Sequence, residues 1–244
     1  MNLVRFLFEE YNQNSLALIT KQSGGDVLYI LYDTVTLQQI QLPQTSPYLP
    51  TKVPLLNLNN IFAAFVSVAE PVDEISGTCN NALMVVRSVA NPTYKGAGTL
   101  LYKIVSSVTK RPIISDRFSS TSDKAKKVWN RFESEPGANK QQLDSFIKNN
   151  DNNQQFVDVQ GSKIVPRTEP KTQTTEDDCV LPNQGDIGSL GHPDSFQFSF
   201  DVSGFVQNHT NMKPVLEKLG IKESDFFTQL QTVSNNVFNA GYYS

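Results

Sequence analysis

The residues with the clearest chemical potential form a short glycine turn, "KGAGT", at positions 95–99. A strand-like run, "ALMVVRSVA", precedes the turn, and a helix-like run, "LLYKIVSSV", follows it. Free amides and the helix dipole attract anions to a helix N-terminus, and glycine lets a ligand approach the backbone without meeting a Cβ. The pattern therefore predicts a phosphate-binding turn, although Gly-x-Gly is equally compatible with a purely structural turn.

Positive charge is concentrated on the same segment. Between Lys95 and Arg131 there are nine basic and two acidic residues, a local balance of +7 in a chain of net charge −3. Such an excess attracts a polyanionic ligand. The alternative is that three of these residues, Lys124, Lys126 and Lys127, form the solvated face of an ordinary helix.

Two common phosphate-binding patterns do not fit the turn. The Walker A spacing is absent, and Leu101 stands where the dinucleotide fingerprint needs a third glycine. The acidic pI of about 5.4 argues against general nucleic-acid binding. No apolar run reaches the roughly 18 residues of a membrane span.

The two cysteines, Cys79 and Cys179, stand one hundred residues apart and in no metal-ligand spacing. We expect two reduced thiols and a cytoplasmic protein. The start of the chain, "MNLVRFLFEEYNQ", is interpreted as a helix or strand of the fold rather than a signal peptide.

The elements around the turn follow from hydrophobic periodicity. "SLALITKQ" and "DVLYILYDTVTLQQI" flank the turn residues Ser23–Asp26 and predict a hairpin, and "QLPQTSPYLPTKVP" predicts a loop. The runs at 61–70 and 81–90 are rich in β-branched residues and predict strands. An apolar stripe predicts a helix over 99–109, and Ile113 and Ile114 a short buried strand.

The order strand, helix, strand, helix is completed by a helix after Ser122, a favourable N-cap residue. Its apolar face consists of Ala125, Val128, Trp129 and Phe132. This βαβα order predicts an α/β layer with neighbouring parallel strands.

The rest of the chain suggests three regions. Residues 1–148 form the main domain, 149–194 a polar loop or insertion, and 195–244 a strand plus a two-helix C-terminal appendage. The alternating "SFQFSFDV" is the strand, a short helix closes at Gly220, and the last helix starts at Ser224 and ends at Gly241. The histidines His192 and His209 are expected on the surface or in loops.

The turn resembles the signature of the GNAT superfamily of acetyl-CoA-dependent N-acetyltransferases, Gln/Arg-x-x-Gly-x-Gly/Ala, between the fourth strand and third helix. In one register Lys95 takes the Gln/Arg position, Gly98 the first glycine and Leu100 the last position. In the other, Gly96 and Gly98 are the glycines and Thr93 takes the Gln/Arg position. Either register implies that the amides of Gly96, Ala97, Gly98 and Thr99 face the pyrophosphate of acetyl-CoA.

Further motifs are similar to a GNAT-like group often encoded by bacteriophages. These are Gly-x-Gly-x-Leu-Leu-Tyr at 96–102, Ser-Asp-Arg at 115–117, Ala-x-x-Val-Trp at 125–129 and Asp-Asp-Cys at 177–179. The likeness covers roughly residues 60–180. It implies a GNAT-like mixed central sheet flanked by helices.

The resemblance also implies a mechanism. A backbone N–H on the strand at Val86 to Ser88 polarises the thioester carbonyl. Asp116 is the best-placed carboxylate for a base, and the alternative is that it pairs with Arg117 or caps the next helix. Trp129 stands where the family often has an acidic tyrosine, and it is expected to pack in the core. A thiol acceptor role for Cys179 is the less favoured option.

Two functions remain open from the sequence. One is an acetyl-CoA-dependent N-acyltransferase with an unknown amine acceptor, located in the cytoplasm, or the host cytoplasm if viral. The other is a non-catalytic GNAT-like structural or assembly protein of a phage particle, with other phage proteins as partners and a place in the virion.

Overall fold

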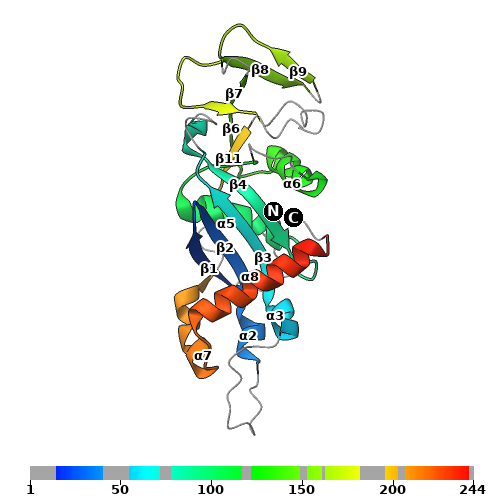
Figure 1. Cartoon of the computed structure of the whole chain (residues 1–244), viewed down its shortest axis with the longest axis vertical. Helices are drawn as coiled ribbons and strands as arrows, with labels where there is room; N and C mark the ends of the chain where they lie inside the picture. The colour runs from blue at the N-terminus through cyan, green and yellow to red at the C-terminus, as the bar shows by residue number, and fades with distance from the viewer. Residues whose placement is uncertain are drawn as a thin grey trace.

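The computed structural model describes residues 15–40, 55–71, 78–116, 122–148, 153–160, 163–181, 196–202 and 207–241. The fold is mixed α/β, with an eight-stranded sheet and a separate four-stranded sheet (Figure 1). The expected N-terminal element and the proline-rich loop lie outside the described residues. No helix within the described ranges has the length and apolar character needed to cross a membrane.

The large sheet has the order β12-β1-β2-β3-β4-β5-β11-β6. Its strands are β1 (Leu16–Ser23), β2 (Asp26–Asp33), β3 (Phe62–Ala69), β4 (Leu83–Ala90), β5 (Ile113–Ile114), β6 (Asn139–Gln142), β11 (Phe196–Ser199) and β12 (Gln207–Asn208). Strands β1 to β4 are successively antiparallel, and β4 and β5 are parallel. The predicted hairpin, the strands at 61–70 and 81–90 and the parallel pair are therefore confirmed.

Helices cover both faces of this sheet (Figure 1). One face packs against α5 (Ala97–Thr109) and α6 (Asp123–Ser134). The other packs against α2 (Thr34–Gln38), α3 (Leu55–Ile61), α7 (Lys213–Lys218) and α8 (Glu223–Asn239). The predicted Ser122 cap is confirmed, because its side chain accepts the amide proton of Ala125. The last helix begins two residues earlier than the sequence predicts, after Lys222 rather than Ser224.

The side chains of strand β2 pack on both faces of the large sheet. Leu28, Ile30 and Tyr32 belong to the cluster that includes α8, whereas Tyr29 and Leu31 belong to the cluster that includes α5. The two-residue period of a strand sends alternate side chains to opposite faces. A strand that is apolar on both faces therefore needs helices on both sides.

The C-terminal segment expected as an appendage is part of the large sheet. Strand β11 lies between β5 and β6 and pairs with both, and α8 lies across the sheet in Figure 1. The alternating phenylalanines Phe196 and Phe198 explain this position, since their side chains are buried in the cluster beside Trp129 and Phe132. Sequence alternation predicts such a strand but not its neighbours.

The segment expected as a polar loop contains most of the second sheet. Strands β8 (Gln154–Gln160), β9 (Lys163–Pro166) and β10 (Asp178–Val180) join β7 (Asp144–Lys148) in the order β10-β7-β8-β9. This sheet begins before residue 149, so the expected boundary falls inside it.

A disulfide connects the two sheets. Cys79, in the short helix η2 (Cys79–Asn81) before β4, is bonded to Cys179 on β10 across a sequence separation of 100 residues. The expectation of two reduced thiols is therefore wrong, and the disfavoured thiol acceptor role of Cys179 is not available while its sulfur is bonded. Spacing along the chain carries no information about such a long-range approach.

The disulfide should be a large contributor to stability. Because a long loop is closed, we expect its loss to reduce the free energy of unfolding by about 2 to 4 kcal/mol. Urea unfolding of the oxidised protein and of the Cys79→Ala/Cys179→Ala double variant measures this. Thiol labelling followed by intact mass checks the pairing, and two alkylated cysteines in the native, unreduced protein would contradict it.

His209 is buried, contrary to the expectation of a surface or loop histidine. Its Nδ1 and the Tyr32 hydroxyl are joined by a hydrogen bond of 2.6 Å, and Nε2 lies 3.7 Å from a carboxylate oxygen of Glu223. Burial lowers the pKa of His209, with Lys213 acting in the same direction and Glu223 against it. Burial also raises the pKa of Tyr32, which keeps its proton.

This environment predicts a pH dependence of stability. The folded state holds His209 neutral. The stabilisation of the fold by neutral His209 is therefore complete above the ordinary histidine pKa of about 6.5, and it is lost as pH falls through the lowered pKa of the folded state. Urea midpoints should therefore fall more between pH 7 and pH 5 for the parent than for His209→Gln. Parallel profiles for the two proteins would show that His209 does not contribute.

Candidate functional site

Strand β4 carries one residue too many for its partner β3. Val85 lies opposite Val68 and Arg87 opposite Ser67, so Val86 has no partner on β3. This is the geometry of a β-bulge, which leaves one residue unpaired and increases the local twist. Val86 is 39% exposed, unusual for a valine within a central strand.

The bulge also reverses which side chains face which helix. Before it, Leu83 and Val85 belong to the cluster that includes α5. After it, Val89 belongs to the cluster that includes α8, and the Arg87 guanidinium lies 4.0 Å from the ring centre of Phe238 on α8. Without the extra residue, these odd-numbered side chains would share one face.

On its other side, β4 pairs with β5 only as far as Met84, two residues before the bulge. Leu83 pairs with Ile113 and Met84 with Ile114, and the described part of β5 ends there. Val86 on β4 and Asp116 after β5 each follow the last paired residue of their own strand by two positions.

The glycine turn follows β4 directly and is fixed by Asn91. The Asn91 side-chain amide donates to the carbonyls of Asn59 at 2.6 Å and Phe62 at 2.8 Å, and its oxygen accepts the Thr93 amide at 3.0 Å. One buried side chain thus ties the turn to the end of α3 and the start of β3.

Tyr94 supplies a second anchor for the turn. Its ring is buried in the cluster beneath α5, and its hydroxyl donates to the carbonyl of Asn60 and lies 3.4 Å from a carboxylate oxygen of Asp33. These contacts preorganise the backbone that leads into the helix.

Gly96 begins α5 in a conformation that favours glycine, with φ of +84°. A Cβ added there would meet nothing within 4 Å, so the backbone conformation, not crowding, explains the glycine. The Ala97 amide donates to the Tyr94 carbonyl, and the Leu100 amide to that of Gly96. The amides of Gly98 and Thr99 make no hydrogen bond within the described part of the chain, which leaves them as unpaired donors at the helix start. Gly98 is buried and Thr99 is half-buried, so an anion would approach from the side of Thr99.

The remaining predicted residues lie on several elements. Lys95 is exposed beside the turn, and Asp116 is half-buried. Ser88 lies on β4, where its Oγ accepts a hydrogen bond of 2.6 Å from the buried Tyr102 hydroxyl on α5. Trp129 is 2% exposed and packs against neighbouring aromatic rings, as its predicted core role requires.

The positive charge of this segment is partly neutralised by acids elsewhere in the sequence. Lys103 is buried and paired with Glu135, and Arg111 is paired with Glu70. The hydrogen bond from Arg111 is the main reason that the pKa of Glu70 is lowered. The +7 balance of the sequence therefore overstates the charge that a ligand would meet.

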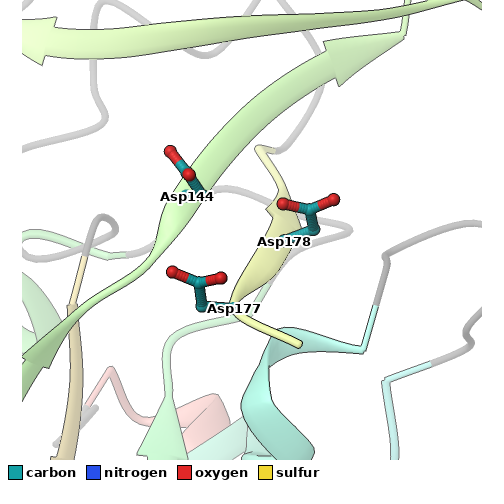
Figure 2. Close-up of side chains that lie close together, drawn as sticks. All are labelled: Asp144, Asp177 and Asp178. Atoms are coloured by element: carbon teal, nitrogen blue, oxygen red, sulfur yellow. The ribbon is translucent and has the colours of Figure 1, made fainter. Parts of the chain in front are cut away.

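A second group of polar residues lies in the small sheet and was not recognised as a group from the sequence. Asp144, Asp177 and Asp178 come together there, each with an oxygen within 4.8 Å of the others (Figure 2). Burial raises the pKa of Asp178, and the charges of Asp144 and Asp177 add to this effect. The Asp-Asp-Cys motif marks two members, but nothing in the sequence connects them to Asp144.

A surface hollow of about 450 Å³ lies at α7 and the start of α8. Its lining includes Leu216 and Ile221, together with charged residues such as Lys213 and Glu223. None of the site residues predicted from the sequence lines it.

Comparison of the chain with protein-family models, with curated proteins and with solved structures found no match. The functional argument therefore depends on the geometry of the chain itself.

The buried pair of Lys103 and Glu135 should be structural. Both side chains are 6% exposed, so Lys103→Met leaves a buried carboxylate without its partner and should cost about 3 to 5 kcal/mol. Urea unfolding measures this loss, and Lys103→Met/Glu135→Leu should recover much of it. Lys126→Met is the control, because its partner Asp123 is 95% exposed and the pair should contribute no more than about 1 kcal/mol. Equal losses in the two single variants would contradict the assignment.

Proposed function

We propose that this chain is an acetyl-CoA-dependent N-acyltransferase of the GNAT type, with an amine acceptor still to be identified. The observation that carries the proposal is the bulge at Val86, which lies just beyond the last pair of β4 with β5, on the strand that leads to the unpaired amides of Gly98 and Thr99. One strand thus leads from an exposed backbone step to an anion-binding helix start.

The donor set fits the phosphate end of the cofactor. The amides of Gly98 and Thr99 and the N-terminal dipole of α5 would bind the pyrophosphate, with Lys95 exposed nearby. Asn91 and Tyr94 would hold these donors in place. A preorganised turn loses little conformational entropy when it binds a ligand.

The bulge fits the thioester end. When bound, the cofactor supplies the acyl group that the acceptor amine attacks. A backbone amide in the stretch Val86 to Ser88 would stabilise negative charge developing on the thioester oxygen, because that side of β4 is not paired with β5 beyond Met84. The Tyr102 hydroxyl would position Ser88 from within the core.

Proton transfer is assigned to Asp116, which would accept a proton from the acceptor amine, directly or through water. Its position two residues after β5, just beyond the end of the pairing with β4, supports this role. Trp129 is excluded as an acid because its indole N–H does not ionise in this range, and its side chain is buried.

The second candidate is a non-catalytic GNAT-like protein of a phage particle. One observation favours this candidate. Tyr94 and Tyr102 are the tyrosines closest to the turn in sequence, and the hydroxyls of both make hydrogen bonds within the fold. A protein of this kind could keep the turn and bulge as structural features without turnover.

Calorimetric titration of acetyl-CoA into the parent and Thr99→Glu tests the proposal. Glutamate in the first turn suits the helix dipole, so the fold should be retained, whereas its charge would repel the pyrophosphate. We expect micromolar binding by the parent and a loss on the order of a hundredfold or more, equivalent to about 2.7 kcal/mol, in the variant.

Thr99→Val is the matched control, because it keeps the side-chain shape and leaves the backbone amide in place. It should bind like the parent. No binding by the folded parent at millimolar acetyl-CoA would contradict the proposal. Binding without release of free CoA across a panel of amines would favour the non-catalytic candidate.

A further inference from the structure

The three aspartates of the small sheet come from two adjacent strands. Asp144 on β7 is the register partner of Asp178 on β10, and the Asp144 amide donates to the carbonyl of Asp177. Like charges directly opposite each other on neighbouring strands are unfavourable unless a positive charge lies between them. The arrangement therefore raises the question of which positive charge neutralises the three carboxylates.

Two of the three carboxylates have partners in the chain. Asp144 accepts the amides of Lys171 at 2.6 Å and Thr172 at 2.9 Å and pairs with Arg167. Asp177 accepts the Thr172 hydroxyl at 2.9 Å and the Thr174 hydroxyl at 3.2 Å. Each bonded oxygen still has lone-pair capacity, because a carboxylate offers about four acceptor sites.

Asp178 differs from the other two. Asp178 is only 7% exposed. Its Oδ1 is buried and has no hydrogen-bond partner among the described residues. In Figure 2 one oxygen of Asp178 is turned toward the space that Asp144 and Asp177 also border. A buried carboxylate oxygen with no donor is costly, which indicates a positively charged ligand.

The charge balance around the cluster points the same way. The connected network contains four carboxylates, which are the three aspartates of the cluster and Asp158. It contains two cations, Arg167 and Lys171. Arg167 pairs with Asp144 and Asp158, and Lys171 with Asp158. None of these ion pairs includes Asp178, and the excess of two negative charges equals the charge of one divalent cation.

We propose that Asp144, Asp177 and Asp178 bind a divalent cation, with Ca²⁺ as the preferred ion. Three carboxylate oxygens within 4.8 Å of one another fit a sphere whose ligands lie at about 2.3 to 2.6 Å, the range of Ca²⁺. Mg²⁺ needs shorter and more regular contacts, so it should bind less well. Water completes the coordination.

The ion has a structural role. It joins β10 to β7 at the residues before Cys179, whose disulfide connects this sheet to η2 and β4. Among the described residues, the small sheet has one apolar cluster of Val157 and Leu181, with Ile147 and Ile164 packed against it, and a ring contact between Phe146, which is buried, and Phe156. A bound cation therefore supplies stability that a small apolar core does not.

Calorimetric titration of CaCl₂ and, separately, MgCl₂ into the oxidised, chelator-treated full chain tests this site. Ca²⁺ should bind with measurable heat and raise the thermal midpoint, and Mg²⁺ should do so more weakly. In Asp178→Asn the Ca²⁺ affinity should fall at least about tenfold. The same variant should be more stable than the parent without metal, because it loses an unpaired buried charge.

Asp123→Asn is the matched control, because it removes the same charge from a side chain that is 95% exposed. It should keep the full response to Ca²⁺. The proposal is overturned if the parent shows neither heat nor a midpoint shift up to about 10 mM Ca²⁺, above the dissociation constants of weak calcium modules. It is also overturned if Asp178→Asn responds like the parent, and Asp177→Asn provides the same test if the first variant does not fold.

Discussion

One extra residue in β4 is the constraint on which the arrangement of the large sheet depends. The bulge at Val86 lets Leu83 and Val85 pack toward α5 while Val89 packs toward α8, so a single strand serves both layers. It also bends the strand where pairing with β5 ends. The exposed residue Val86 is therefore a consequence of this local irregularity, whereas the start of α5 is set by Asn91, Tyr94 and Gly96. The proposed cofactor site depends on both features.

The small sheet is stabilised by other interactions than those of the large sheet. Its apolar cluster is small, and a covalent bond and a network of charges take the place of a large core. Cys79, Asn80 and Asn81 adopt positive φ values of 46°, 55° and 58°, which L-residues adopt at a cost of roughly 1 to 2 kcal/mol each. The disulfide and the hydrogen bond from the Asn80 amide to the Glu176 carbonyl hold this turn in place.

Charge in this protein has to be counted in space rather than along the chain. Lys103 belongs to the basic segment near the glycine turn, but its ammonium group is buried against Glu135 and is not presented to a ligand. Conversely, Asp144 is distant in sequence from Asp178, yet the two face each other across a parallel strand pair. In both cases tertiary packing decides whether a charge is available, because Coulomb interactions depend on distance and dielectric environment.

The sequence by itself determined the local elements and the helix start at Gly96, because periodicity, capping residues and glycine act over a few neighbouring positions. It predicted the parallel pair around α5 and the buried role of Trp129 for the same reason. Only the tertiary structure decided the bulge at Val86, the place of β11 within the sheet, the Cys79–Cys179 bond and the aspartate cluster. These features depend on which distant segments meet, and strand register and side-chain pairing are not encoded in the spacing of residues along the chain.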